Sequence, residues 1–331
     1  MVLLKGLLEA HDSLDVVAFL DKRAVTALSP EGLKRVYWVK HSLLSRVYVE
    51  IILALDSAAD DLILCFHGLP PLLPNRGSVC VFLQNAHYFG RTSLRRFSLK
   101  VATRIKLEQY ISSVLRYRVS KYIVQTMSMK LLLLNWYKNG VGKFLPPPSI
   151  EIWPFINNPV PIFFDVSESH YDFIYIADGA AHKNHIRLVD AWIELSKSNI
   201  RPSLCLTLGP RDHKLVDYIN FVVKKYKLNI INIGYVEHNR ALSLYQRAGA
   251  LIFPSLVESF GLPLIEASNA GLNIIAPELD YVRDVCSPTY TFDPNSAISI
   301  SRAVKRFIGV ECFQPKILTP NEFWQNLRKL G

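Results

Sequence analysis

Residues 254–267 read Pro-Ser-Leu-Val-Glu-Ser-Phe-Gly-Leu-Pro-Leu-Ile-Glu-Ala and follow a short apolar run. The run predicts a buried strand, and Pro263 suits the first turn of a helix, so the stretch indicates a strand, a loop and a helix. Ligands of open α/β sheets bind at the carboxyl ends of the strands, where such a loop lies. We therefore expect Glu258 and Glu266 to reach one pocket, where carboxylates can hold the hydroxyls of a sugar or ribose.

The backbone of the same stretch suits a phosphate. Gly261 lets the chain approach a ligand closely, and Leu262 precedes the predicted helix at residues 263–269. The unpaired N–H groups at a helix N-terminus can bind a phosphate. Two glutamates eight residues apart also occur by chance in most proteins, so the pair by itself does not decide the function.

The second half of the chain alternates short β-branched runs with amphipathic stretches, which is the pattern of consecutive βαβ units. Strands are predicted at residues 171–177, 203–208, 230–234, 250–254, 273–276 and 290–292. Helices are predicted at residues 185–197, 214–226, 240–248, 263–269 and 296–308. We expect a doubly wound parallel sheet in a C-terminal domain of residues 171–331.

The first half repeats this style less regularly and predicts a second Rossmann-like domain at residues 1–156. Strands are predicted at residues 16–20, 35–39, 62–66, 79–83 and 122–125, and helices at residues 43–55 and 94–118. A domain of this type normally opens with a strand that precedes its first helix. Residues 2–10 already look like that helix, so either the start codon is misplaced or the domain lacks its first strand. Prolines at 146–148, 154, 159 and 161 indicate a stiff connection, and we place the linker at residues 157–170.

The composition of the chain indicates which kinds of binding partner and which cell compartment to expect. The 331 residues are 50% hydrophobic and carry 38 Lys and Arg against 28 Asp and Glu, a net charge of +10 that favours anionic partners. No run approaches the roughly 18 apolar residues of a membrane span, and the N-terminus does not read as a secretory signal, so we expect a cytoplasmic protein. The cysteines show no CxxC pair and are expected to be reduced thiols: Cys65, Cys80, Cys205, Cys286 and Cys312.

The stretch from Glu258 to Glu266, with its Phe-Gly-Leu-Pro core, resembles the E-x7-E motif of glycosyltransferase family 4, the glycosyl transferases group 1 family of retaining GT-B enzymes. The resemblance extends over residues 171–309. It implies a GT-B fold, in which two Rossmann-like domains face one another across a cleft. It also implies a C-terminal domain that binds a nucleotide-sugar donor, in which Glu258 orients the sugar and Glu266 holds the ribose.

The loop at residues 178–184 is similar to the family loop whose lysine binds the donor diphosphate, which here is Lys183. The family usually has an arginine five residues earlier, where this chain has Asp178, and His182 or Arg211 could compensate. Gly234 and Tyr235 resemble the turn at which the family's backbone meets the nucleobase.

In the N-terminal domain the family places a polar group, often histidine, at the end of a strand that faces the reacting sugar. This chain has Gln84 at that point, and His87 and Asn85 are the candidate site residues. For a single histidine such as His87, a structural role is commoner than a catalytic one.

From Arg91 to Lys121 the chain carries nine Lys or Arg against the single acid Glu108. This region is either a solvated helix face or a surface for an anionic membrane.

The sequence has neither a complete GxGxxG nor a P-loop, which disfavours a nicotinamide enzyme and an ATPase. We predict a retaining glycosyltransferase that transfers a sugar from a nucleotide-diphosphate sugar to a saccharide or a polyprenyl-diphosphate-linked acceptor in surface polysaccharide synthesis, such as that of O-antigen. No metal or other cofactor is expected, and no nucleic acid, since no nucleic-acid motif accompanies the charge. The alternatives are a catalytically impaired homologue that acts as a scaffolding subunit, and a sugar-nucleotide epimerase.

Overall fold

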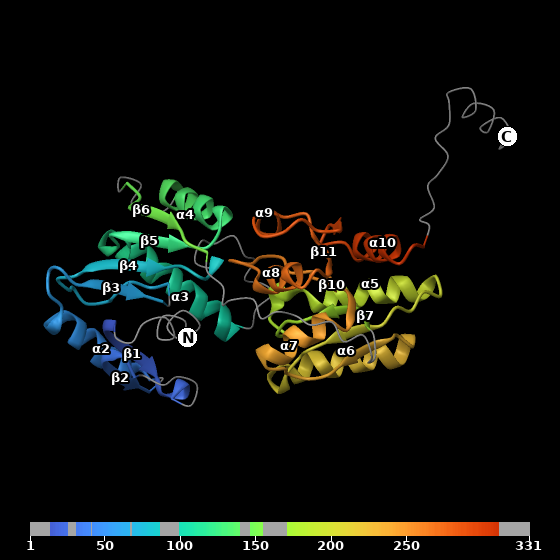
Figure 1. Ribbon diagram of the computed structural model, residues 1–331, viewed down its shortest axis with the longest axis horizontal. Coiled ribbons are helices and arrows are strands. Elements are labelled where there is room, and N and C mark those ends of the chain that lie inside the picture. Colours follow the sequence, from blue (N-terminus) through green and yellow to red (C-terminus); the bar gives the residue numbers. More distant parts are fainter. Residues whose placement is uncertain are drawn as a thin grey trace, which may run out of the picture.

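The computed structural model describes residues 14–25, 31–40, 42–66, 68–86, 99–139, 146–154 and 171–310. Figure 1 shows two lobes side by side, with the first half of the chain in blue to green and the second half in yellow to red. Each lobe is built on parallel strands covered by helices. No helix within the described residues has the length and apolar character needed to cross a membrane.

The C-terminal lobe contains a six-stranded parallel sheet in the order β12-β11-β10-β7-β8-β9. Its strands are β7 (Tyr171–Tyr175), β8 (Leu204–Leu206), β9 (Ile230–Asn232), β10 (Ala248–Ile252), β11 (Asn273–Pro277) and β12 (Tyr290–Phe292). The helices are α5 (His185–Lys197), α6 (His213–Tyr226), α7 (His238–Tyr245), α8 (Leu262–Asn269), α9 (Asp280–Arg283) and α10 (Ala297–Phe307). The chain leaves β7 in one direction and returns to its other side at β10, so the sheet is doubly wound, as expected, and its switch point lies between β7 and β10.

Burial on both faces explains why the strands of this lobe are continuous apolar runs. Phe173, Ile174 and Tyr175 of β7 are wholly buried, and so are all three residues of β8. A parallel sheet covered by helices on both sides has no polar face, so the sequence shows no alternation. The fully buried Trp192 of α5 meets the Phe173 ring edge to face at a centroid distance of 5.6 Å.

The N-terminal lobe contains two separate parallel sheets. β3 (Leu62–Cys65), β4 (Ser78–Phe82), β5 (Lys121–Val124) and β6 (Ser149–Ile152) form one, and β1 (Leu14–Asp21) pairs with β2 (Leu33–Val39) in the other. Its helices are α2 (Leu43–Asp56), α3 (Leu99–Leu115) and α4 (Met127–Asn139). Among the described residues no strand joins β1 to β3. The residues before Leu14, which include the helix predicted at residues 2–10, lie outside the described part.

Two elements of this lobe differ from the sequence prediction. Residues 149–152, assigned to a stiff proline connection, form β6, because the prolines at 146–148 end just before it and β6 is an edge strand. Helix α4 was not predicted, since its run of leucines shows no clear helical period. The predicted linker at residues 157–170 and the start of the predicted helix at residues 94–98 lie outside the described residues. The four described cysteines are free thiols.

Candidate functional site

Lys183 and Glu258 meet at the switch point of the C-terminal sheet. Lys183 ends a short 3-10 turn after β7, and Glu258 lies in the loop after β10. The Lys183 Nζ atom lies 2.7 Å from Glu258 Oε1, with only 17% and 12% of the two side chains exposed. The two residues predicted from separate motifs therefore form one largely buried ion pair, and charges interact more strongly there than in water.

Hydrogen bonds to backbone carbonyls join the two loops that carry Lys183 and Glu258. The Leu256 N–H donates to the His182 carbonyl over 2.8 Å. The buried Asn184 side chain donates to the carbonyls of Pro254 and Pro294 over 3.1 and 2.7 Å. Asn184 has a φ of 63°, a left-handed conformation that asparagine tolerates better than most residues. Sequence reasoning did not assign Asn184, although it follows the lysine directly.

A network of buried hydroxyl groups holds the backbone next to the Lys183–Glu258 pair. The Tyr175 hydroxyl donates to the Lys183 carbonyl over 2.8 Å and lies 3.2 Å from Ser255 Oγ. The Tyr281 hydroxyl donates to the Ser255 carbonyl over 2.7 Å. Burial raises the pKa of both tyrosines well above the usual value, so they stay protonated donors. These hydroxyls therefore fix the backbone at Lys183 and at Ser255.

His185 is the first residue of α5 and packs beside the Tyr175 ring at a centroid distance of 4.7 Å. Burial lowers the pKa of His185 to about 3, against the favourable charge of Asp178. Neither ring nitrogen has a hydrogen-bond partner among the described residues. The imidazole is therefore neutral at physiological pH, and it is a packing group under the lysine loop.

Glu266, the second predicted carboxylate, lies in α8 and is held by two side chains. Tyr245 donates its hydroxyl to Glu266 Oε2 over 3.1 Å, and His238 Nδ1 lies 3.6 Å from Oε1. Burial raises the pKa of Glu266, while His238 and the Tyr245 hydrogen bond act in the opposite direction. Tyr245 and His238 come from α7, and sequence reasoning assigned neither of them.

The turn before α8 has the backbone conformation that glycine favours. Gly261 has a φ of 71°, and a Cβ added there would lie 3.1 Å from the Leu264 side chain. Leu262 begins α8 and is 41% exposed. The N–H groups that start this helix thus stand between Glu258 and Glu266 in the sequence, as the motif predicted.

Gly234 and Tyr235 lie in the loop between β9 and α7. Gly234 has a φ of 82°, and the Tyr235 side chain is 72% exposed. Asn232 anchors this loop to the end of β8, because its side chain accepts from the Leu208 N–H over 2.9 Å and donates to the Leu208 carbonyl over 3.1 Å. The exposed Tyr235 ring is available to a ligand.

Asp178, which stands where the family that the sequence resembles usually has arginine, shapes its own loop. Its carboxylate accepts a hydrogen bond from the Ala180 N–H over 3.1 Å. A Cβ on Gly179 would come within 2.6 Å of the Asp212 carboxylate, so this loop passes very close to the 3-10 turn between β8 and α6. Arg211, a candidate replacement for the arginine, is exposed on the 3-10 turn that contains Asp212.

The candidate residues of the N-terminal lobe are only partly described. Asn85 is half-buried after β4 and Gln84 is exposed, while His87 lies outside the described residues. Of the basic region, α3 and the residues that follow it are described, but Arg91, Arg95 and Arg96 are not.

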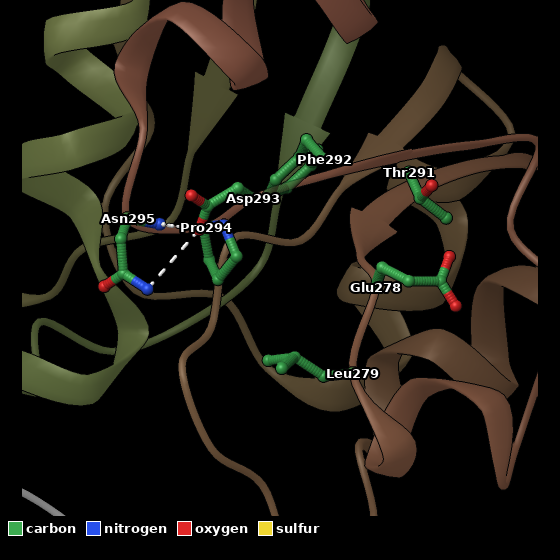
Figure 2. Close-up of a pocket in the computed structure, with 7 residues that line it drawn as sticks. All are labelled: Glu278, Leu279, Thr291, Phe292, Asp293, Pro294 and Asn295. Atoms are coloured by element: carbon green, nitrogen blue, oxygen red, sulfur yellow. Dashed lines mark hydrogen bonds between the residues drawn. The ribbon is translucent and has the colours of Figure 1, made fainter.

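A cavity of about 430 Å³ lies at the carboxyl ends of β11 and β12 (Figure 2). Figure 2 shows Glu278, Leu279 and residues 291–295 around it. The Asn295 backbone N–H donates a hydrogen bond to the Asp293 carboxylate over 2.9 Å. Its charged lining residues, Glu278 and Asp293, are acids, so it does not suit a diphosphate. In the part of the chain that the structure describes, no three His, Cys, Asp or Glu residues gather as a metal site would require.

Residues 164–316 match the family model Glycosyl transferases group 1. This segment contains the whole described site of the C-terminal lobe, from Lys183 to Glu266. The chain is also 28% identical over 214 residues to sucrose-phosphate synthase 4 of Arabidopsis thaliana, a match that covers 59% of this chain and 18% of the synthase.

Solved structures establish the fold. Pneumococcal O-GlcNAc transferase GtfA, solved in complex with UDP and GlcNAc, has a TM-score of 0.55 at 16% identity and matches over 88% of this chain and 55% of its own. WaaG, a glycosyltransferase involved in lipopolysaccharide biosynthesis, has a TM-score of 0.61 at 15% identity over 89% of this chain and 90% of its own. The chain thus spans less than a fifth of the synthase and about half of GtfA. It has the GT-B fold, which confirms the predicted fold class.

Proposed function

We propose that this chain is a retaining glycosyltransferase of family 4 that transfers a sugar from a nucleotide-diphosphate sugar to an acceptor. The observation that carries the proposal is the Lys183–Glu258 pair at the switch point of the C-terminal sheet, inside the segment that matches the family model. A cation and a carboxylate that share one crevice suit a donor which has both a diphosphate and a hydroxyl-rich sugar.

Each side chain then has a distinct part in the reaction. Lys183 has three N–H donors and gives one to Glu258, so two remain for the diphosphate. Together with the first N–H groups of α8, it offsets the negative charge that grows on the leaving diphosphate. Glu258 orients the donor sugar and Glu266 accepts the ribose hydroxyls, while Gly234 and Tyr235 contact the base. The acceptor hydroxyl attacks the face from which the diphosphate departs.

We assign acceptor binding to the N-terminal lobe, with Asn85 and His87 facing the reacting sugar, and an anionic lipid surface to α3. Ile105 and Ser112 of this helix are buried, whereas Leu107, Tyr110 and Val114 are 58%, 68% and 49% exposed. The exposed residues follow a helical spacing of three and four, so they form one apolar ridge on the solvent side.

Lys100 and Arg104 flank this ridge on one side and Lys106 on the other. Apolar ridges bordered by cations bind anionic headgroups. An acceptor carried on a polyprenyl diphosphate would be presented at such a surface, as in the synthesis of a surface polysaccharide by a cytoplasmic enzyme.

Thermal denaturation with UDP, GDP, dTDP, CMP and ADP tests the donor site. At 100 times its dissociation constant, a bound nucleotide should stabilise the protein by about 2.7 kcal/mol. We expect a shift with one nucleoside diphosphate, lost in Glu266→Ala and kept in Glu194→Ala, whose carboxylate forms an ion pair with Lys197 elsewhere on the same lobe. A folded protein that responds to none of the nucleotides would contradict the proposal.

A scaffolding subunit is the second candidate. It is favoured by Asp178 in the place of an arginine. Within the described residues, it is also favoured by the separation of the β1–β2 sheet from the sheet that begins with β3. Release of the nucleoside diphosphate from a donor sugar, measured with and without added acceptor saccharide, separates the two candidates. Turnover that Glu258→Gln abolishes supports the enzyme, and nucleotide binding without turnover supports the scaffold.

A further inference from the structure

Both chain neighbours of Glu258 contact the N-terminal lobe. Val257 packs against the buried cluster of that lobe, which includes Val81, Val124 and Leu133. On the other side of Glu258, the Ser259 carbonyl accepts a hydrogen bond from Thr126 Oγ1 over 3.3 Å. The carboxylate that pairs with Lys183 is therefore held between two contacts made by the opposite lobe.

Thr126 is well placed to hold this loop. It is only 3% exposed and lies two residues after β5, immediately before α4, so its backbone is fixed between a strand and a helix. Its Oγ1 also accepts a hydrogen bond from the Met129 N–H over 3.3 Å, which caps the start of α4. One hydroxyl thus accepts from its own helix and donates to the loop of the other lobe.

A second contact joins the lobes at the same helix end. The Asp284 carboxylate accepts a hydrogen bond from the Ser128 N–H over 2.9 Å, although 156 positions separate the two residues. An acid at a helix N-terminus satisfies an unpaired N–H and interacts favourably with the helix dipole. Figure 1 shows α4 and α9 next to one another at the boundary between the lobes.

Helix α9 connects this contact with the site. Asp284 follows α9 directly, and Tyr281 within α9 donates its hydroxyl to the Ser255 carbonyl. Ser255 in turn lies beside Tyr175, which bonds to the Lys183 carbonyl. The contacts of α9 therefore reach from the start of α4 to the Lys183 carbonyl and to Ser255, three residues before Glu258.

We propose that Thr126 and Asp284 are positioning residues, which hold Glu258 against Lys183 only when the two lobes are docked. The role of Glu258 rests on the proposed function, whereas the docking itself does not. Loss of these contacts leaves nucleotide binding within the C-terminal lobe intact. It lowers turnover, because misplacement of a reacting group by about 1 Å can cost about 100-fold in rate.

The test uses the full chain and matched substitutions. Thr126→Val removes the hydrogen bond to Ser259 together with the cap on Met129, and Thr126→Ser keeps both. Asp284→Ala removes the acceptor for Ser128, Asp284→Asn keeps one, and Asp280→Ala makes the same change at the exposed start of α9 as a control. Melting temperatures establish that each variant is folded.

Small-angle X-ray scattering, UDP binding by calorimetry and donor turnover are then measured. We expect Thr126→Val and Asp284→Ala to increase the radius of gyration. UDP affinity should stay within about twofold, and kcat should fall roughly tenfold for Thr126→Val and less for the exposed Asp284. Thr126→Ser, Asp284→Asn and Asp280→Ala should resemble the unchanged chain.

Scattering and kcat that are unaltered in Thr126→Val and Asp284→Ala would overturn the inference. If the unchanged chain binds none of UDP, GDP, dTDP, CMP and ADP and turns over no donor, the proposed function fails, and the scattering alone still decides whether these residues hold the lobes together. If the conservative variants lose kcat as fully as Thr126→Val and Asp284→Ala, the positioning role is wrong.

Discussion

The hydroxyl of Tyr245 donates a hydrogen bond to Glu266 Oε2 over 3.1 Å. Tyr245 is almost fully buried, and burial raises its pKa well above the usual value, so its hydroxyl keeps the proton that it donates to Glu266. The bond fixes one carboxylate oxygen and leaves the other near His238, at 3.6 Å from Nδ1. The carboxylate proposed to hold the ribose is therefore oriented before any ligand arrives.

Tyr245→Phe should weaken nucleotide binding without abolishing it. The variant keeps the ring but leaves Glu266 without its donor, and a hydrogen bond to a charged group contributes about 1.5–3 kcal/mol. We expect a roughly tenfold loss of UDP affinity by calorimetry, since part of the carboxylate's orientation survives through the packing of α8. Unchanged affinity in a folded Tyr245→Phe protein would show that Glu266 does not depend on this bond.

Glu266 also predicts a pH dependence. Because burial raises its folded-state pKa above 4.5, the folded protein retains the proton more strongly than the unfolded chain. Ionisation of Glu266 therefore lowers stability as the pH rises from about 4.5 through the folded pKa. Glu266→Gln should raise the melting temperature at pH 7 and converge with the unchanged protein near pH 4. It should also lose nucleotide affinity at pH 7, and a variant that is less stable at pH 7 would contradict the argument.

His185 predicts the opposite dependence. Its pKa is about 3 in the folded state against 6.5 for an ordinary histidine, so the unfolded chain takes up a proton first as the pH falls. Stability is present above pH 6.5 and is lost toward pH 3, with a slope of up to about 1.4 kcal/mol per pH unit. In urea denaturation at pH 7 to 4, His185→Phe should show a shallower slope, whereas His213→Gln, at an exposed position, should keep it.

The sequence predicts the C-terminal sheet well because its buried strands are uniform apolar runs and its helices are strongly amphipathic. The prediction of α5 at residues 185–197 agrees with the structure at both ends. Lys183, Glu258 and Glu266 could be predicted as site residues because a motif of contiguous residues contains or surrounds each of them. Their spatial relationship, one ion pair and one half-buried carboxylate, comes from the strand order.

The supporting residues could not be found in this way, since their partners lie far away in the chain. Thr126 contacts Ser259 at a separation of 133 positions, and Tyr175 contacts Ser255 at a separation of 80. No local pattern distinguishes these hydroxyls from other buried ones. Strand β6 was missed for a different reason, because the prolines before it suggested an irregular connection although they end where the strand begins.

Lys183 and Glu258 should differ in the step that they affect. Lys183→Ala removes the cation proposed to bind the diphosphate and should reduce UDP affinity by tenfold or more, because charge-assisted hydrogen bonds are the stronger ones. Glu258→Gln keeps the shape and one acceptor, so UDP should bind within about threefold while donor turnover falls at least 100-fold. Calorimetry and turnover assays separate the two effects. Equal loss of UDP binding in both variants would place Glu258 in nucleotide binding instead.

The apolar ridge on α3 predicts binding to anionic vesicles. Tyr110 is 68% exposed, so Tyr110→Glu should leave the melting temperature unchanged while it places a negative charge in the ridge. In flotation with vesicles that contain about one third anionic lipid, we expect the unchanged chain to bind and Tyr110→Glu to lose most of this binding. Phe221→Glu is the matched control, because Phe221 is 64% exposed on α6 of the other lobe. Equal binding by Tyr110→Glu and Phe221→Glu would show that α3 does not face the lipid, since the ridge and its flanking cations would then contribute nothing beyond the net charge of the chain.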